Sequence, residues 1–320
     1  KNIDSDFSKK IHSCNVNDVN LFKESYSLNH RTRAFLKVQD GCDYKCSFCT
    51  IPLARGKSRS NTISNVIDNV HKIAFKNIKE IVLTGINLGD FGANSNDSIQ
   101  YNFFDLVKEL DKLDLSVRFR ISSIEPNLLT DEIIEFISTS KSFVHHFHIP
   151  LQSGSDSVLK LMRRRYDSKL YNSRIKMINQ LMPDACIGVD VIVGFPGEDD
   201  DKFLESMSFI EDLDISYLHV FKYSERDNTH AITLSNIVNP KIRSKRSKLL
   251  RLLSSRKKAR FYNKNIGTTH QVLFESEDKN GFIEGFSSNY VRFRKKWDSS
   301  LAGRIVESKF TEIDSEGFAI

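Results

Sequence analysis

The stretch that decides the fold is Gly41-Cys42-Asp43-Tyr44-Lys45-Cys46-Ser47-Phe48-Cys49, which holds three of the chain's five cysteines at a Cys-x3-Cys-x2-Cys spacing. Thiolates repel one another, so a group this dense indicates a soft metal centre that stabilises their deprotonated form. A closed zinc site and a complete iron–sulfur ligand set each need four protein ligands. Either a fourth ligand comes from elsewhere, or one iron of a 4Fe–4S cluster stays open for a substrate.

The composition is that of an ordinary globular protein, with 39% hydrophobic and 28% charged residues among 320. This length can bury a sizeable core and predicts more than one domain. The formal charge of +6 slightly favours an anionic partner. We find no apolar run of about 18 residues and no hydrophobic signal segment. Five cysteines, three of them clustered, are unlike a secreted disulfide framework. We therefore expect a cytoplasmic protein without a membrane partner.

From residue 34 onward, short apolar runs alternate with segments of helical spacing. The runs predict strands at 34–39, 80–86, 117–122, 145–151, 187–195 and 217–223. The intervening segments predict helices at 61–76, 103–113, 130–139, 156–162, 170–181 and 201–213. Such alternation is typical of a parallel sheet with crossover connections. Because a closed eight-stranded barrel takes about 250 residues, these six units predict an α/β fold with an open, six-stranded partial (β/α) barrel.

Small or polar residues follow every predicted strand, at the end where parallel α/β folds place their chemistry. Besides the cysteine loop, these runs contain Gly85, Asn87, Ser122, Glu125, Gln152, Asp190 and Phe195. Any one run is equally well explained as a turn or a helix cap. Because all the strand ends carry such residues, we expect them to line one shared pocket.

The last part of the chain is basic. Ten lysines and arginines lie between residues 240 and 260 with no acidic residue among them, beside leucines at helical spacing. This predicts a helix that docks through its leucines and offers cations to a phosphate-rich partner. Residues 262–320 contain five short strand-like runs with turns between them, which predict a small antiparallel β-barrel. Basic residues alternate with aromatic ones there, as in oligonucleotide-binding barrels.

These patterns predict four segments: a linker from a missing upstream domain at 1–30, the partial barrel at 31–239, a basic linker helix at 240–261 and an RNA-binding barrel at 262–320. We interpret Cys14, alone in the first segment, as incidental. The predicted RNA-binding residues are Arg256, Lys257, Lys258, Arg292, Arg294, Lys295 and Lys296.

Longer motifs narrow the family. The cysteine loop, with the aromatic Phe48 before its last cysteine, is similar to the signature of radical S-adenosylmethionine (SAM) enzymes. The runs at 31–42, 51–56, 83–92, 148–155 and 190–198 resemble, in order, those of the methylthiotransferases, and most of all the bacterial group that acts on tRNA threonylcarbamoyladenosine. The C-terminal segment resembles the TRAM domain that these enzymes use on RNA. The resemblance covers nearly everything from Arg31 onward.

The resemblance implies a mechanism. Cys42, Cys46 and Cys49 would hold a 4Fe–4S cluster whose fourth iron binds S-adenosylmethionine, and a 5′-deoxyadenosyl radical would remove hydrogen from C2 of an adenine next to the anticodon. Phe48 and Phe195 would flank the cofactor's adenine, and glycines at Gly85 and Gly194 would let the backbone approach it. Its amino-acid and ribose groups would be bound by Asn87, Ser122, Glu125, Gln152 and Asp190.

The resemblance also implies partners, namely a tRNA anticodon stem–loop and an electron donor such as flavodoxin or ferredoxin, and we expect a monomer. Family members have an N-terminal domain whose three further cysteines hold a second 4Fe–4S cluster. Nothing in this sequence matches that domain, and Cys14 cannot substitute for it. We expect a fragment that binds one cluster and lacks the full sulfur-inserting activity.

Two kinds of alternative stay open. The same chemistry could act on isopentenyladenosine in tRNA or on an aspartate of a ribosomal protein; only the local runs at 31–41 and 83–92 favour threonylcarbamoyladenosine. A zinc-stabilised RNA-binding module without catalysis is the alternative of another class. We interpret Cys186 as a core residue and His145, His146 and His148 as packing residues, with His148 close enough to the pocket to remain a candidate.

Overall fold

The computed structural model describes residues 16, 19, 21–27, 32–93 and 100–320, so that Cys14 and most of the predicted linker lie outside the described residues. Six parallel strands follow one another along the chain: β2 (Arg33–Lys37), β5 (Glu80–Thr84), β6 (Arg118–Ile121), β7 (His146–His148), β8 (Cys186–Val193) and β9 (Tyr217–Lys222). Burial is nearly continuous along β5, β6 and β8. Strands covered on both faces require such apolar runs.

The six parallel strands belong to two sheets, where the sequence predicted one continuous partial barrel. One sheet has the order β1-β2-β5-β6, with β1 (Ser25–Ser27) antiparallel to β2, and the other has the order β7-β8-β9. Isolated parallel bridges from Phe119 to Phe143 and from Ser123 to His148 join them. Regular pairing stops between β6 and β7. Strand β7 has only three residues, and β6 ends at Ile121, after which the chain forms one of the loops at the candidate active site.

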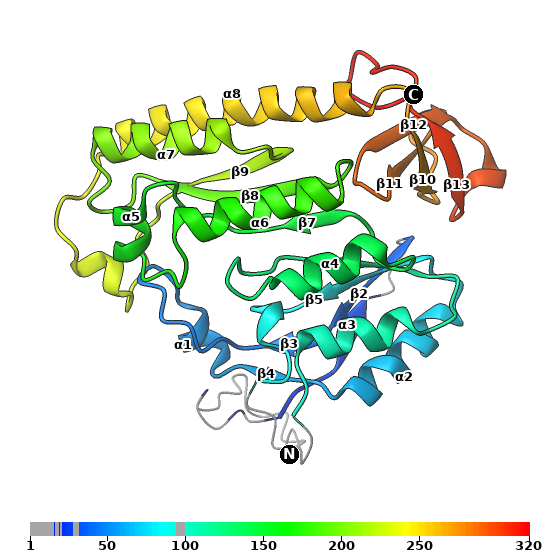
Figure 1. Ribbon diagram of the computed structural model, residues 1–320, viewed down its shortest axis with the longest axis horizontal. Coiled ribbons are helices and arrows are strands. Elements are labelled where there is room, and N and C mark those ends of the chain that lie inside the picture. Colours follow the sequence, from blue (N-terminus) through cyan, green and yellow to red (C-terminus); the bar gives the residue numbers. More distant parts are fainter. Residues whose placement is uncertain (1–15, 17–18, 20, 28–31, 94–99) are drawn as a thin grey trace, which may run out of the picture.

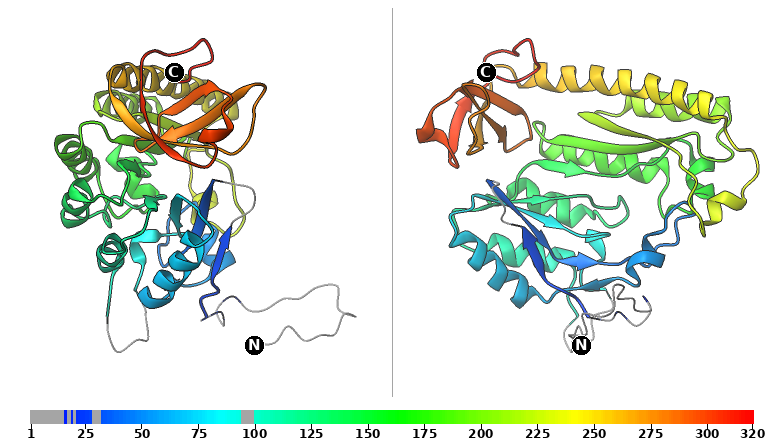
Figure 2. Two further views of the ribbon diagram at one scale, coloured as in Figure 1. Left: turned by 90° about the vertical axis from the view of Figure 1, so that its right-hand side faces the viewer. Right: turned by 180° about the vertical axis from the view of Figure 1, so that it is seen from behind.

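Helices lie on one face of the strands, in front of them in Figure 1 and behind them in the rear view of Figure 2. They are α1 (Ile51–Arg55), α2 (Ile63–Ala74), α3 (Phe103–Asp111), α4 (Asp131–Thr139), α5 (Asp156–Leu161), α6 (Ser168–Leu181) and α7 (Asp200–Asp212). Apolar spacing decides which side turns inward: Val66, Val70 and Ile73 of α2 are fully buried. Asn102 and Asp105 form a capping box at the start of α3, a signal that the sequence reading overlooked.

Short elements complete this part of the chain. Strands β3 (Gln39–Asp40) and β4 (Arg59–Ser60) pair antiparallel on either side of the cysteine loop. Single 3-10 turns occur at η2 (Leu88–Asp90), η3 (His230–Thr233) and η4 (Ser299–Leu301). No helix within the described ranges is long and apolar enough to cross a membrane.

The long helix α8 (Pro240–Asn265) runs along β9 and leads into the C-terminal sheet (Figure 1). That sheet is antiparallel and has the order β12-β11-β10-β13, from β10 (Thr269–Phe274), β11 (Phe282–Ser287), β12 (Arg292–Lys296) and β13 (Ile305–Lys309). The predicted fifth strand is reduced to bridges from Ala319 to Phe293 and Ile313. A turn from Asp314 to Phe318 takes up the start of the strand predicted at 317–320, while Ala319 still bonds Arg292 and Arg294 of β12. The order of the sheet stays open, where the sequence predicted an antiparallel β-barrel.

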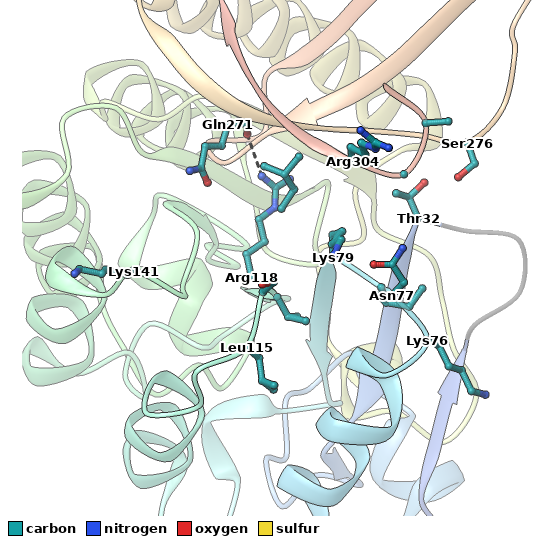
Figure 3. Close-up of a pocket in the computed structure, with 16 residues that line it drawn as sticks. Thr32, Lys76, Asn77, Lys79, Leu115, Arg118, Lys141, Gln271, Ser276 and Arg304 are labelled. Carbon is teal, nitrogen blue, oxygen red and sulfur yellow. Dashed lines mark hydrogen bonds between the residues drawn. The ribbon is translucent and has the colours of Figure 1, made fainter. Parts of the chain in front are cut away.

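The C-terminal sheet docks on the N-terminal ends of the parallel strands. Arg118, the first residue of β6, donates hydrogen bonds to the carbonyls of Gln271 and Phe286, each 3.0 Å away. Cys186, the first residue of β8, is 2% exposed and belongs to the C-terminal core, which confirms it as a core cysteine. A cleft of about 940 Å³ follows one side of this junction (Figure 3). The cysteine loop and α1 lie at the other end of the strands (Figure 1).

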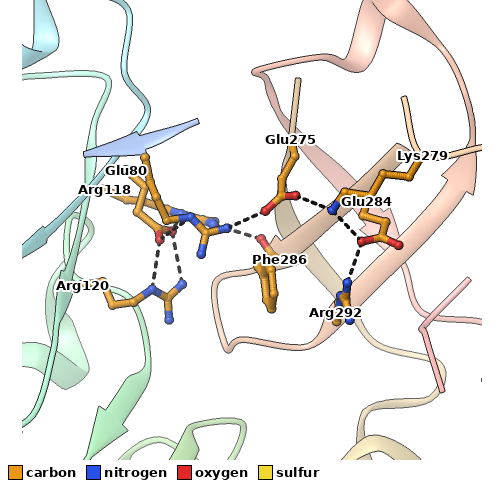
Figure 4. Close-up of polar contacts among 9 residues, drawn as sticks. Glu80, Arg118, Arg120, Glu275, Lys279, Glu284, Phe286 and Arg292 are labelled. Atoms are coloured by element: carbon orange, nitrogen blue, oxygen red, sulfur yellow. Dashed lines mark hydrogen bonds and ion pairs between the residues drawn. The ribbon is translucent and has the colours of Figure 1, made fainter. Parts of the chain in front are cut away.

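A buried carboxylate organises the junction. Glu80 begins β5, is fully buried, and accepts hydrogen bonds from Arg118 at 2.7 Å and Arg120 at 3.0 Å (Figure 4). Arg33 of β2 lies 3.8 Å from the same carboxylate and 3.5 Å from Glu275 of the C-terminal domain. Burial opposes ionisation of Glu80, but the charges of Arg120 and Arg118 outweigh it and hold its pKa far below the ordinary value.

A second carboxylate gathers cations within the C-terminal sheet. Glu284, whose side chain is 4% exposed, lies 3.0 Å from Lys279, 2.7 Å from Arg292 and 3.0 Å from Arg294. Burial alone would raise its pKa, but hydrogen bonds from Lys279, Arg294 and Arg292 prevail and lower it to about 2.

Replacing Glu80 by Gln should lower the free energy of unfolding by about 3–5 kcal/mol, because it leaves Arg118 and Arg120 buried without a counter-charge. Urea titration monitored by circular dichroism measures this. The matched control is Glu109→Gln, which removes an exposed carboxylate paired only with Lys112 and should change stability by less than about 1 kcal/mol. Equal effects of the two substitutions would contradict the role given to Glu80.

Glu284 should make the stability of the C-terminal sheet depend on acid pH. Its lowered folded pKa means that the ionised carboxylate stabilises the fold above the unfolded pKa of about 4.3, and that this contribution of about 3 kcal/mol disappears as pH falls toward 2. Glu284→Gln should therefore be less stable than the unsubstituted chain at pH 7 and equal to it near pH 2. Urea unfolding between pH 2 and pH 7 measures this, with the exposed Glu277→Gln as control. A difference in stability between Glu284→Gln and the unsubstituted chain that did not change with pH would contradict the inference.

Candidate active site

The cysteine loop is fixed at its centre by Ser47. The Ser47 N–H donates to the Met162 carbonyl at 3.0 Å, and its hydroxyl donates to the Leu161 carbonyl at 2.8 Å. The Ser47 carbonyl accepts from the Ala231 N–H at 2.7 Å. The end of α5 and the start of η3 thus both bond Ser47. The cysteine loop is therefore held by segments that are distant from it in the sequence.

Each of the three sulfur atoms accepts a hydrogen bond. The Tyr44 N–H donates to Cys42 Sγ and the Ile51 N–H to Cys49 Sγ, both at 3.4 Å, while Arg164 Nη1 donates to Cys46 Sγ at 3.0 Å. Burial raises the pKa of Cys42 to about 11 and also raises that of Cys46. The thiols of Cys42 and Cys46 therefore stay protonated without a cation, and the donors around the loop stabilise the thiolates that metal binding would produce.

A second group of possible ligands lies outside the cysteine loop. Within the described part of the chain, the ligand atoms of His148, Asp190 and His219 lie within 4.8 Å of one another.

Arg164 is the main site residue that the sequence reading missed. Its side chain is 4% exposed and bonds to Cys46, to Tyr166 at 3.1 Å and to the carboxylate of Glu125. Glu125, a predicted cofactor contact, is thus linked to Cys46 through the Arg164 side chain. The signal was the basic run at 163–165, which follows α5 and reads as an ordinary helix end.

Two predicted pocket residues carry polar atoms without a partner among the described residues. Asn87 is 4% exposed and its amide donates to Asp90 at 2.5 Å, but its Oδ1 accepts no hydrogen bond. The hydroxyl of Ser122 is buried and equally unpaired. Buried polar atoms are nearly always hydrogen-bonded in native proteins. Orphaned atoms at two adjacent strand ends therefore fit a site for a polar ligand.

Gln152 is held in a strained backbone conformation, with a φ of 67°. Its N–H donates to the Asp190 carbonyl at 2.8 Å, and its carbonyl accepts from the Ile192 N–H at 2.9 Å. The β8 backbone thus fixes Gln152 on both sides, so its side chain leaves the strand end in one defined direction.

Asp190 belongs to a polar group on three neighbouring strands. Its Oδ1 lies 2.8 Å from His148 Nε2, and His219 of β9 completes the set of close ligand atoms. Burial lowers the pKa of His219, so this ring is neutral at neutral pH. The structure thus places the candidate His148 beside Asp190.

Three predicted cofactor contacts have another explanation. A Cβ on Gly85 would lie 2.9 Å from Oε1 of Gln39, which accepts the N–H groups of Ile86 and Asn87. A Cβ on Gly194, whose φ is +74°, would lie 2.2 Å from the Arg243 side chain. Both glycines therefore make room for protein side chains. Phe195 is fully buried and Phe48 packs edge-on against it at 6.3 Å, so Phe48 alone of the two has an accessible surface.

The predicted RNA-binding residues divide into exposed and engaged cations. Arg256, Lys258 and Lys296 are exposed. Lys257 is buried, contrary to its prediction, because its ammonium donates to the carbonyls of Glu211 at 3.1 Å and Leu213 at 2.6 Å at the end of α7. A cation there stabilises the last turn of α7.

The four basic residues of β12 also differ in how far they are exposed and in whether they bond other residues. Arg294 is 14% exposed and pairs with Glu284 and Glu316, and Lys295 donates to the Ser308 hydroxyl at 3.0 Å. Arg292 bonds Glu284 but stays 43% exposed. The structure brings Arg292 and Lys258 together at one cavity, and the other predicted residues do not line it.

Replacing Cys42, Cys46 or Cys49 by Ala should abolish iron uptake in anaerobic reconstitution, whereas the unsubstituted chain should bind about four irons and absorb near 400 nm because the loop ligates one 4Fe–4S cluster. The matched control is Cys186→Ala, which removes a buried thiol outside the loop. Iron and labile-sulfide analysis measures the result. One equivalent of zinc with no iron uptake would contradict the cluster and favour a structural ion.

Comparison with known proteins agrees with this geometry. The family model described as the radical SAM superfamily matches residues 36–210. A solved radical S-adenosylmethionine methyltransferase, TsrM of Kitasatospora setae, shares the fold with a TM-score of 0.52 at 14% identity, over 62% of this chain and 35% of that one.

Curated relatives are tRNA-modifying enzymes. The threonylcarbamoyladenosine tRNA methylthiotransferase of Bacillus subtilis is 39% identical over 285 residues, which is 87% of this chain and 62% of that protein. Its counterpart in Rickettsia prowazekii is 35% identical over 90% of this chain and 70% of that protein. The tRNA-2-methylthio-N(6)-dimethylallyladenosine synthase of Bacillus pumilus is 33% identical over 88% of this chain and 56% of that protein. The chain thus spans about 62% of the first relative's length and belongs to the radical SAM superfamily and, within it, to the tRNA methylthiotransferases.

Proposed function

We propose that the chain is the cluster-binding and RNA-binding part of a tRNA methylthiotransferase that acts at C2 of N6-threonylcarbamoyladenosine next to the anticodon. The observation that carries the proposal is the cysteine loop at the carboxyl ends of the parallel strands, with its three hydrogen-bonded thiols. The unpaired polar atoms of Asn87 and Ser122, after β5 and β6 at the same ends, support it. The higher identity to the threonylcarbamoyladenosine enzymes than to the dimethylallyladenosine enzyme supports the choice of substrate.

The cofactors of this superfamily are a 4Fe–4S cluster and S-adenosylmethionine. When bound, they supply a carbon-centred radical that can remove hydrogen from a carbon without an acidic proton. Cys42, Cys46 and Cys49 would hold the cluster. Their three thiols are one ligand short of four, which leaves a coordination position for the second cofactor.

Charged and polar side chains complete the cofactor site. The Arg164 guanidinium, bonded to Cys46, stabilises negative charge at the thiolates and is balanced by Glu125. Asn87 Oδ1 can accept a hydrogen bond from an ammonium group, and the Ser122 hydroxyl can bond a carboxylate or ribose oxygen. Phe48, half-buried at the loop, can pack against a purine.

The cleft at the domain junction supports an RNA partner. Its lining includes Lys76, Lys79, Arg118, Lys141 and Arg304 and no acidic residue (Figure 3). Among the residues that the structure describes, Lys79, Lys141 and Arg304 have no ion-pair partner, whereas Arg118 is neutralised by Glu80. Cations without carboxylates beside them are suited to a phosphodiester backbone.

Deleting the gene should remove the methylthio group from threonylcarbamoyladenosine in tRNA and leave it on isopentenyladenosine. Mass spectrometry of nucleosides from digested tRNA measures both marks in one sample, so that each serves as the control for the other. Complementation with the gene should restore the lost mark, and complementation with the Cys46→Ala form should not.

Other outcomes of the same experiment identify other functions. Loss of the mark from isopentenyladenosine alone would reassign the substrate. Intact tRNA marks with an unmodified ribosomal-protein aspartate would move the chemistry to protein. If no methylthio group is lost from RNA or protein, the enzymatic proposal is wrong.

A further inference from the structure

A cavity of about 310 Å³ lies where α8, β9 and the C-terminal sheet meet. None of its lining residues is shared with the large basic cleft, so the two hollows are separate. Its size is at the lower end of the range typical for small-ligand sites. Six of its eleven lining residues have aromatic rings: Tyr217, His219, Phe261, Tyr262, Phe286 and Tyr290.

One wall of the cavity is a preformed column of rings. Phe286 and Tyr290 stack at 4.8 Å, and His146 lies 4.3 Å from Tyr290. Arg33 lies over the Phe286 ring at 4.8 Å and Arg120 over the Tyr290 ring at 4.6 Å. Contacts within the protein thus already hold both rings in place without a ligand.

Backbone strain holds Tyr290 in that column. Tyr290 has a φ of 67°, a backbone conformation that residues other than glycine rarely adopt. The turn is fixed by Ser287, whose hydroxyl bonds Asn289 at 2.6 Å and accepts the Val291 N–H at 2.8 Å, and by Asn289, which donates to the Asp184 carbonyl at 2.9 Å. Strain of this kind persists where the surroundings impose it and is concentrated at functional sites.

The opposite wall is accessible. Tyr217, His219 and Phe221 alternate along β9 and therefore share one face of the strand. His219 is exposed, and Phe221 is 53% exposed although it is a large apolar ring. The row runs from the cavity toward the carboxyl end of β9, where the cysteine loop lies. Such a row of rings leads from the C-terminal sheet toward the candidate active site.

Two cations stand at the cavity and no acidic residue lines it. Lys258 is exposed and lies over the Tyr262 ring at 5.3 Å, with no ion-pair partner in the described part of the chain. Arg292 bonds Glu284 with one nitrogen and is 43% exposed. Rings beside cations are the combination by which proteins hold single-stranded nucleic acid.

We propose that this cavity binds one unpaired nucleotide of the RNA substrate, with the base against His219 and Tyr217 and its phosphates at Lys258 and Arg292. The inference rests on the proposed function for the RNA itself and adds a second point of recognition, distinct from the modified adenosine. A base held in this cavity anchors the RNA loop. The row of Tyr217, His219 and Phe221 along β9 guides the neighbouring nucleotide toward the cysteine loop.

The test measures binding of the full chain to a fluorescein-labelled RNA stem–loop with an unpaired loop, by fluorescence anisotropy at several salt concentrations. His219→Ala should weaken binding on the order of tenfold, because one base loses its stacking partner. Lys258→Gln should weaken it and reduce the slope of log K against log salt by about 0.7. The matched controls are His230→Ala and Lys169→Gln, exposed residues outside the cavity and outside the basic helix, and both should bind as the unsubstituted chain does.

A second measurement reports the contact directly. Stem–loops with 5-iodouridine at successive loop positions are irradiated with the chain, and the crosslinked peptides are mapped by mass spectrometry. One loop position should crosslink to residues 217–219 or 286–292, and a fully paired RNA of the same composition should not.

The outcomes separate this inference from the proposed function. If the chain binds the stem–loop but His219→Ala and Lys258→Gln match their controls, the cavity is not the site and the RNA partner stands. Binding of free adenosine monophosphate as tightly as the stem–loop would show a mononucleotide site and overturn the inference. No binding of the stem–loop by the unsubstituted chain would remove the RNA partner from the proposed function.

Discussion

The arrangement of the two parts of the chain depends on the ion pairs that the buried Glu80 carboxylate forms. The carboxylate is fully buried at the start of a central strand and is surrounded by three guanidinium groups, from Arg33, Arg118 and Arg120. Uncompensated burial of any of these charges would cost several kcal/mol. Glu80 supplies a counter-charge to all three, Glu275 supplies a second one to Arg33, and the remaining donors of Arg118 bond the carbonyls of the C-terminal sheet. The polar network thus fixes the docking geometry more specifically than apolar contacts would.

Much of the basic character of the chain is consumed by such internal contacts. Arg243 and Arg246 of α8 are about 5% exposed and bond the loops that follow β8 and β9, with Arg246 2.8 Å from the buried Glu198. Lys257 and Arg294 are likewise engaged within the protein. A count of cations along the sequence therefore overstates the surface available to phosphates. The junction cleft and the aromatic cavity differ from the rest of this basic region in that cations line them and no acidic residue does.

The sequence was informative where the signal is local. Helical spacing, apolar strand runs and the three cysteines gave the order of elements and the centre of the site, because each depends on neighbours within a few residues. The interruption between β6 and β7 could not be predicted, since it depends on how many residues each strand contributes to pairing. Arg164 was missed because its contacts with Cys46 and Glu125 span 118 and 39 residues. Gly85 and Gly194 were predicted to let the backbone approach the cofactor, whereas the groups that occupy the space beside them, Gln39 and Arg243, are set by tertiary packing.

Strand β8 connects the two ends of the molecule. Its first residue, Cys186, lies in the core of the C-terminal domain, and Phe195, just beyond its last residue, packs against Phe48 of the cysteine loop. Eight residues of parallel strand span about 26 Å. Under the proposed function, an RNA held at the C-terminal sheet would present to the cysteine loop only a nucleotide that can reach across this length. The length of one strand would then limit which nucleotide is modified.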